Sequence, residues 1–137
     1  MLFPCSRDRR LAYVQGQTDV PARRCNHTWH CSPAQAQDAT AGKRLFTMNC
    51  SACHSPMPGQ NLVGPSLFNV INRHSGQIPN FHYSRANVNS GLTWNVATLD
   101  RYLTAPRELV PGTKMTFPGL KDAKQRADVI AYLATLH

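Results

Sequence analysis

The sequence contains one short run of residues whose types and spacing could do chemistry, Cys50-Ser51-Ala52-Cys53-His54. Two thiols lie three positions apart and an imidazole follows the second one. On a helical turn, residues three apart share a side, so both thiols can form thioethers to the two vinyl groups of one porphyrin. The adjacent His54 is then held under the iron, where tethering keeps its local concentration high. C-x-x-C-H is the attachment pattern of a c-type haem.

Two other uses of these cysteines are a dithiol redox pair and half of a zinc site. A thioredoxin-like pair requires a surrounding βαβ pattern, which this sequence lacks. A zinc site requires a second ligand pair nearby, and no cysteine follows Cys53. The pattern therefore favours haem.

If His54 fills one axial position, the other ligand must approach from the opposite face. Met57 is only three residues past His54 and cannot reach around a haem. Met48 belongs to the segment that leads into the attachment turn, on the same side. His137 ends a segment that we expect to pack on the first helix.

His74, His82 and Met115 remain as candidates for the sixth ligand. Met115 stands out because residues 111–119 contain two prolines and two glycines, a loop that can present one side chain. A methionine in such a loop otherwise serves in packing. A thioether is a soft, neutral ligand that favours Fe(II), so His/Met ligation raises the reduction potential relative to two histidines.

The residue pattern predicts short helices and long loops around this motif. An apolar face at helical spacing predicts a first helix that runs into Cys50, through Gly42, Leu45, Phe46 and Asn49. Residues 55–91 carry too many prolines and glycines for long regular structure and should wrap something.

Two further helices are expected in the C-terminal half. Thr93 can cap a helix in which Val96, Leu99, Tyr102 and Leu103 share one face. Pro106 ends this helix, and a short turn follows before Pro111. Asp122 is the expected N-cap of the last helix, because Gln125 follows it at capping-box spacing. We expect this helix to run to about Leu136. Its predicted apolar face is Ala123, Ala127, Ile130, Leu133 and Ala134. No segment alternates like a strand, so the fold class is all-α.

Length and charge narrow the function classes. A chain of 137 residues has room for one core, which disfavours an enzyme with separate cofactor and substrate domains. The longest apolar run has six residues, Val129 to Ala134, far short of the ~20 that a membrane span requires. The net charge of +8 comes from scattered basic residues without an interleaved aromatic platform, which disfavours nucleic acid.

Residues 1–36 differ from the rest because they lack lasting periodicity and hold three cysteines, Cys5, Cys25 and Cys31. Ala34-Gln35-Ala36 looks like a signal-peptide cleavage site, but the apolar region before it is missing. The segment is either the product of a wrong start or frame upstream of the domain, or a natural disordered extension. A third interpretation is a zinc site from its cysteines and histidines, Cys25, His27, His30 and Cys31.

Residues 37–137 resemble class I cytochromes c, most closely the mitochondrial cytochrome c and bacterial cytochrome c2 type. The resemblance includes the C-x-x-C-H motif and an aromatic residue four positions after a glycine, Gly42 and Phe46. It implies that the first helix crosses the last one at Tyr132 and Leu133, where glycine allows the backbones to approach. The implied fold is short helices and long loops wrapped around one haem c, covalently bound through Cys50 and Cys53.

The resemblance also implies roles for individual residues. The Pro65 carbonyl accepts a hydrogen bond from His54, His54 and Met115 ligate the iron, and Phe117 shields the haem edge. Four polar or aromatic side chains donate to the propionates, which are costly to bury otherwise: Arg73, Tyr83, Asn87 and Trp94. Two more, Tyr102 and Thr113, are hydrogen bonded on the methionine side.

The function implied is a one-electron carrier, not an enzyme, with acidic redox proteins as partners and no nucleic acid or membrane span. Its donor is a cytochrome bc1-type quinol–cytochrome c oxidoreductase and its acceptor a cytochrome oxidase or photosynthetic reaction centre. The carrier is expected to be a monomer in the bacterial periplasm, with the mitochondrial intermembrane space as the alternative. The competing class is a haem domain of a peroxidase, dehydrogenase or gas sensor.

Overall fold

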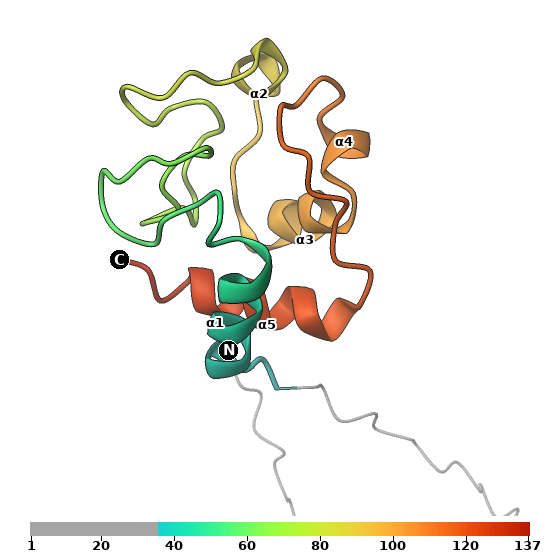
Figure 1. The fold of residues 1–137 in the computed structure, drawn as a ribbon. Coiled ribbons are helices and arrows are strands. Elements are labelled where there is room, and N and C mark those ends of the chain that lie inside the picture. The colour runs from blue at the N-terminus through green and yellow to red at the C-terminus, as the bar shows by residue number, and fades with distance from the viewer. Residues whose placement is uncertain (1–35) are drawn as a thin grey trace, which may run out of the picture. The chain divides into compact units, whose positions relative to one another are not determined.

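The computed structural model describes residues 36–137, which form five helices joined by long loops (Figure 1). The helices are α1 (Ala39–Asn49), α2 (Arg85–Asn89), α3 (Val96–Thr104), α4 (Pro106–Leu109) and α5 (Ala123–Leu133). The β-pairing within residues 36–137 is one isolated antiparallel bridge between His74 and Thr93. The all-α fold class is therefore confirmed, and no helix among these residues is long and apolar enough to cross a membrane.

The interpretations of the N-terminal segment concern residues that lie outside the described range. They include the extension or altered leader assigned to residues 1–36 and the zinc site at Cys25, His27, His30 and Cys31. The same holds for Cys5. Among residues 36–137, no group of three or more histidine, cysteine or acidic side chains could hold a metal ion.

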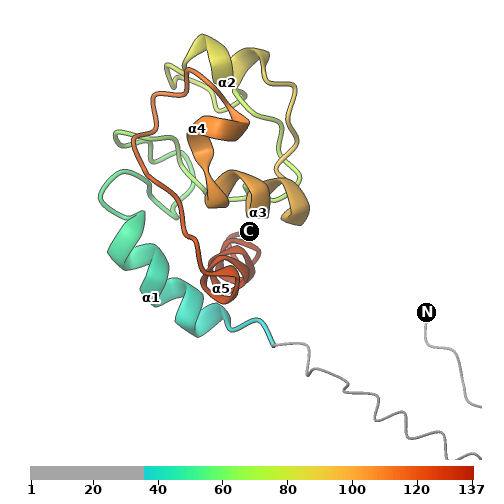
Figure 2. The same cartoon turned by 90° about the vertical axis from the view of Figure 1, so that its right-hand side faces the viewer.

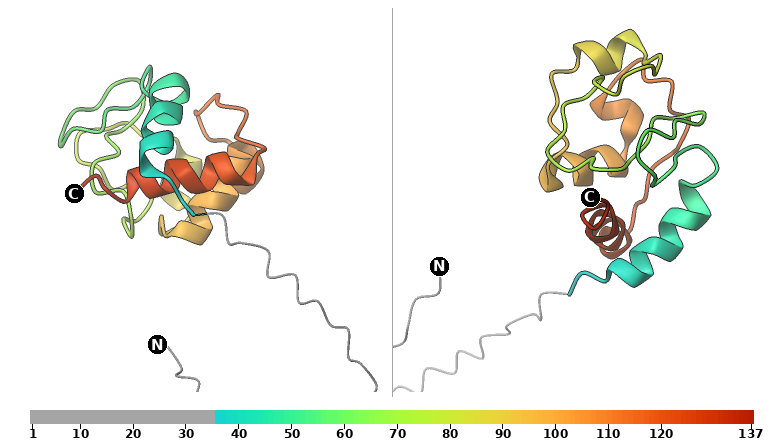
Figure 3. Two further views of the ribbon diagram at one scale, coloured as in Figure 1. Left: turned by 90° about the horizontal axis from the view of Figure 1, so that it is seen from below. Right: turned by 90° about the vertical axis from the view of Figure 1, so that its left-hand side faces the viewer.

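The first and last helices cross in close contact, as the family resemblance implied (Figure 3). Gly42 faces the Asp128 backbone carbonyl and the Tyr132 side chain, where a Cβ at position 42 would lie 2.9 Å from the Tyr132 Cβ and still closer to the carbonyl. The Phe46 and Tyr132 rings pack with centroids 5.3 Å apart. Leu133 is buried beside them. Only glycine allows the two backbones to approach this closely.

The buried face of α5 differs from the predicted one. Ala123 and Ala134 are exposed, whereas Arg126 and Asp128 are buried. Each buried charge has partners: Asp128 accepts from the Asp38 backbone N–H at 2.8 Å and from the Lys124 ammonium at 2.6 Å. Arg126 donates to a carboxylate and to two backbone carbonyls, those of Asp100, Leu120 and Lys121. Burial of a charge requires such pairing, which a pattern of apolar residues cannot indicate.

Three differences concern the middle of the chain. The N-cap of α3 is Asn95, not Thr93, because the Asn95 side chain accepts from the Thr98 backbone N–H at 2.8 Å. Val96, predicted to be in the core, is 51% exposed. The short helix α2, capped by Ser84, was not predicted. The predicted end of α3 near Pro106 is correct, since α3 ends at Thr104 and Pro106 opens α4 at a first-turn position where proline is tolerated.

Asp128→Asn is expected to lower the free energy of unfolding by about 1–3 kcal/mol at pH 7, because it weakens charge-assisted hydrogen bonds to a buried carboxylate. The hydrogen bond from Lys124, then that from the Asp38 backbone, lowers the pKa of Asp128. The ionised Asp128 therefore stabilises the folded state fully above the unfolded-state pKa of about 3.9. This stabilisation is lost as the pH falls through the lower pKa of the folded state.

The difference between wild type and Asp128→Asn should thus be constant from pH 7 to pH 5 and shrink below about pH 4. Guanidinium unfolding at several pH values measures it. Asp122→Asn on the same helix is the control, since asparagine caps as well as aspartate. A difference that keeps its full size at pH 3 would contradict the prediction.

Candidate functional site

The C-x-x-C-H motif forms a tight turn directly after α1. The Cys50 backbone N–H donates to the Phe46 carbonyl at 2.8 Å, and the N–H groups of Cys53 and His54 donate to the Cys50 carbonyl at 3.0 and 2.8 Å. The turn therefore holds both cysteines and the histidine in one short, hydrogen-bonded segment. Cys50 is half-buried and Cys53 is exposed.

The environment of the thiols does not suit a dithiol redox pair. Burial, followed by the neighbouring Cys53, raises the pKa of the Cys50 thiol to about 11. Reactive redox cysteines have a lowered pKa, since the thiolate is the nucleophile.

The His54 ring is oriented from two directions. Its Nδ1 donates to the Pro65 carbonyl at 2.8 Å, and because a carbonyl only accepts, Nε2 is left with its lone pair. Gly64 lies against the ring, where a Cβ would collide with Cε1 and sit 2.7 Å from Nδ1. Burial lowers the pKa of His54, against the opposing effect of the Pro65 hydrogen bond. A neutral imidazole with a free Nε2 fits an iron ligand.

The structure brings three of the four residues matched to the propionate side together around Arg73. The Arg73 guanidinium donates to the Ser66 and Phe68 carbonyls at 3.0 and 2.8 Å. Burial raises the pKa of Tyr83, opposed by the Ile78 backbone and by the nearby Arg73, so the phenol remains a neutral donor. The Trp94 backbone N–H donates to the Arg73 carbonyl at 2.9 Å.

A second hydrogen-bonded group surrounds Met115. The Tyr102 hydroxyl lies 3.4 Å from both the Met115 Sδ and the Thr113 Oγ1. Thr113 donates to the Asn87 side-chain carbonyl at 3.0 Å and so ties the loop to α2. The Tyr102 ring packs on that of Trp94 with centroids 4.8 Å apart. This contact joins the methionine group to the Arg73 and Trp94 group.

The other candidates for the sixth ligand are more exposed than Met115. His74 is exposed and its Nδ1 is hydrogen bonded to Thr93 Oγ1 at 2.9 Å, and His82 is exposed. Met48 and Met57 are 72% and 58% exposed. Among the side chains weighed for the sixth position, Met115 is the one that is half-buried and packed against the core.

Comparison with known proteins gives the family. The cytochrome c family model matches residues 39–137. Cytochrome c2 of Rhodoblastus acidophilus is 54% identical over 100 residues, which are 72% of this chain and 92% of that protein. Cytochrome c2 of Rhodopila globiformis is 50% identical over 99 residues, with 72% and 93% covered.

The chain belongs to the cytochrome c family. Cytochrome c of Euglena viridis is also similar, with 46% identity over 99 residues, 72% of this chain and 97% of that one. The fold matches cytochrome cH from Methylobacterium extorquens with a TM-score of 0.68 and 44% identity, covering 72% and 98% of the two chains.

Membership of the cytochrome c family confirms three expectations. The protein carries one covalent c-type haem through Cys50 and Cys53. It is an electron-transfer protein and not an enzyme. The residues in place fit the group, because the turn offers both thiols and Gly64 leaves space for an oriented, neutral His54.

Residue patterns did not reveal the side chains that support the site in this cytochrome. Ser66 is 1% exposed, and its hydroxyl donates to the Met57 carbonyl at 2.6 Å while its N–H donates to the Asn61 side chain at 2.9 Å. Ser84 Oγ donates to the Asn87 side chain at 2.8 Å. Small polar residues next to prolines and glycines are the available signal, and it does not say which of them is buried.

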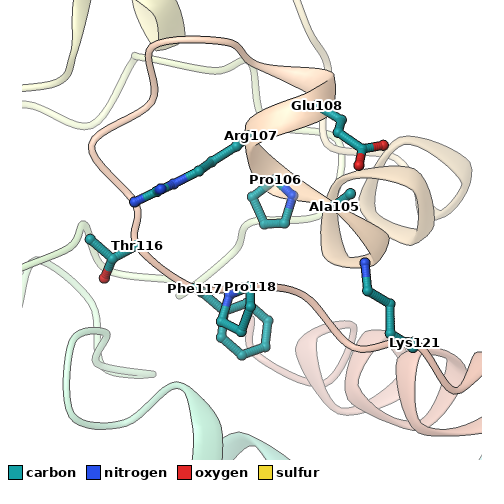
Figure 4. A pocket seen from close by; sticks show the side chains of 8 residues that line it. All are labelled: Ala105, Pro106, Arg107, Glu108, Thr116, Phe117, Pro118 and Lys121. Carbon is teal, nitrogen blue, oxygen red and sulfur yellow. The ribbon is translucent and has the colours of Figure 1, made fainter.

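A hollow of about 270 Å³ lies between α4 and the segment after Met115 (Figure 4). Phe117 and Pro118 face Pro106 and Arg107 across it. Of the predicted site residues, Phe117 alone lines this hollow. It is therefore an outer feature of the methionine loop and is separate from the attachment turn.

Proposed function

We propose that this cytochrome is a diffusible one-electron carrier whose iron is held between His54 and Met115. The observation that carries the proposal is the hydrogen bond from Tyr102 to the Met115 sulfur, in a chain where His74 and His82 are exposed. The loop after α1 and the segment before α5 lie on opposite sides of the fold in Figure 1, which supports ligands that approach from two faces.

The haem supplies one-electron chemistry between Fe(III) and Fe(II), and the protein tunes and protects it. His54 and Met115 would both hold the iron, which would leave no position on it for a substrate. The Pro65 carbonyl orients His54, and the Tyr102 hydroxyl donates to the Met115 sulfur. The Thr113 hydroxyl accepts from the Met115 backbone N–H. Four side chains supply donors for the propionates, namely Arg73, Tyr83, Asn87 and Trp94. Phe117 covers the haem edge.

The proposed partners are acidic redox proteins, with a bc1-type quinol–cytochrome c oxidoreductase as donor and an oxidase or reaction centre as acceptor. Residues 37–137 form the working domain, with ten basic and five acidic side chains, and this charge steers weak, fast encounters. We place the carrier in the bacterial periplasm, which the similarity to two cytochromes c2 supports. We expect it to act as a monomer.

Intact mass and visible spectroscopy of the native protein test the proposal. The mass should equal one haem plus a chain that starts near Gln37, and the ferric protein should show the weak far-red band of a thioether-sulfur ligand. The reduced protein should be oxidised by a purified reaction centre or oxidase, and the oxidised protein reduced by a bc1-type complex. A ferric spectrum without the band would exclude Met115 as ligand.

A further inference from the structure

The peptide unit between Pro65 and Ser66 is hydrogen bonded at both of its ends, and we call it the linking peptide. Its carbonyl oxygen, which belongs to Pro65, accepts from His54 Nδ1 at 2.8 Å. Its N–H, which belongs to Ser66, donates to Asn61 Oδ1 at 2.9 Å. The carbonyl and the N–H of one peptide unit are coupled by resonance. A continuous polar chain therefore runs from the Asn61 amide through the linking peptide to the His54 ring.

The Asn61 side chain can meet the linking peptide in one orientation only. An N–H group needs an acceptor, so the amide oxygen of Asn61 must face the Ser66 N–H. The amide nitrogen of Asn61, Nδ2, then lies 3.5 Å from the Pro79 carbonyl, at the outer limit of a hydrogen bond. The acceptor on the linking peptide is therefore fixed by the donor that it meets.

The surroundings of Ser66 keep the linking peptide in place and away from water. Ser66 is 1% exposed, and Asn61 is half-buried. The Ser66 hydroxyl donates to the Met57 carbonyl at 2.6 Å, and the Ser66 carbonyl accepts from the Arg73 guanidinium at 3.0 Å. In such a buried place the local dielectric is low, and hydrogen bonds that are linked in a chain polarise one another.

We propose that Asn61 is a positioning residue that lowers the reduction potential of the iron through the linking peptide and His54. The proposal rests on the proposed function, in which His54 ligates the iron. An acceptor on the N–H of a peptide makes the carbonyl of that peptide a better acceptor, since linked hydrogen bonds strengthen one another by roughly 10–30% per bond. A stronger hydrogen bond from Nδ1 makes the imidazole a more basic ligand, and a more basic ligand favours Fe(III) over Fe(II).

A purely structural role for Asn61 predicts a different result. If Asn61 only held the loop of residues 55–66 in place, its loss would lower the thermal midpoint without a fixed direction in the reduction potential. The proposed role predicts an order of potentials that follows the acceptor at position 61. The potential should be lowest with aspartate, intermediate with the native asparagine and highest with leucine.

Redox titration of the holo-protein with Asn61→Asp and Asn61→Leu tests this order. Aspartate keeps an acceptor at the Ser66 N–H and strengthens it by its charge, whereas leucine has a similar size and no acceptor. We expect Asn61→Leu to shift the equilibrium about threefold towards Fe(II), which at 59 mV per tenfold is a rise of about 28 mV. Asn61→Asp should shift the potential downwards, and this sign is decisive by itself because the variant leaves the Ser66 N–H paired.

The neighbouring position provides the matched controls. Gln60 is exposed in the same loop and accepts from the Ser55 hydroxyl at 2.6 Å, not from the linking peptide. Gln60→Glu adds the same charge as Asn61→Asp one position away, and Gln60→Leu removes a side-chain amide from the same loop. At about 0.5 M salt, where charge effects through solvent are screened, both control variants should keep the wild-type potential.

Proton NMR of the reduced, diamagnetic holo-protein reports on the His54 hydrogen bond directly. The Nδ1–H resonance should move upfield in Asn61→Leu and downfield in Asn61→Asp, as a weaker and a stronger hydrogen bond require. Potentials of the two Asn61 variants that do not differ from those of the Gln60 controls would overturn the proposal. A wild type whose His54 ring protons lack the large ring-current shift of a haem ligand would instead overturn the proposed ligation by His54.

Discussion

Met115→Ala will keep the covalent haem but lower the reduction potential and open the iron to cyanide and carbon monoxide. The thioether binds Fe(II) better than Fe(III), and each tenfold of that preference is worth about 59 mV for one electron. We expect a fall on the order of 100 mV, measured by redox titration, together with loss of the far-red ferric band.

The exposed methionines provide matched controls for this variant. Met48→Ala and Met57→Ala remove thioethers that are 72% and 58% exposed, and they should leave the potential and the spectrum unchanged. His74→Ala and His82→Ala test the competing ligands in the same way. An unchanged potential in Met115→Ala with a large change in either histidine variant would move the sixth ligand to that histidine.

Gly42→Ala will destabilise the fold by about 3 kcal/mol, although alanine normally stabilises a helix relative to glycine by about 1 kcal/mol. The new Cβ collides with the Asp128 carbonyl and lies 2.9 Å from the Tyr132 Cβ. Because the collision involves the backbone of α5, no side-chain rotation relieves it, and the two helices must separate. Guanidinium unfolding of the holo-protein measures the loss.

Position 43 shows the ordinary helix preference for comparison. Lys43 is exposed on the same helix, so Lys43→Ala should be more stable than Lys43→Gly by about 1 kcal/mol. The sign of the glycine-to-alanine difference should therefore reverse between neighbouring positions. If the alanine form were more stable than the glycine form at both positions, α1 and α5 would have space for a Cβ at the crossing, and the prediction would be wrong.

The parts of the fold that depend on hydrophobic periodicity and on residues that cap or end helices could be predicted from the sequence. The face of Gly42 and Phe46, the capping by Asp122 and the end of α3 before Pro106 all follow from local rules. The buried charges of α5 could not be predicted, since Asp128 depends on a backbone N–H 90 residues away. The cap of α3 was misplaced because Thr93 and Asn95 are both good candidates by residue type.

The functional site also has a part that the sequence predicts and a part that it does not. The spacing of Cys50, Cys53 and His54 is a local pattern, so it identified the haem attachment segment directly. Met115 stands out in the sequence by its loop and by the family resemblance, but the Tyr102 hydrogen bond that supports it as the proposed ligand depends on the folded chain. The exposure of Met57, Leu62 and Val63 could not be predicted, because nothing in a proline- and glycine-rich sequence says which aliphatic side chains face solvent.

The crossing of α1 and α5 also determines where the chain can change in length. The contact between Gly42 and Asp128 closes the intervening chain into one large ring, seen from two sides in Figures 1 and 2. The entropy of closing such a ring rises only by about 0.6 kcal/mol for each doubling of its length. Insertions in a mostly exposed stretch such as residues 77–82 therefore change the closure entropy very little. The helix crossing tolerates no added atom, whereas the loops that it closes can vary in length.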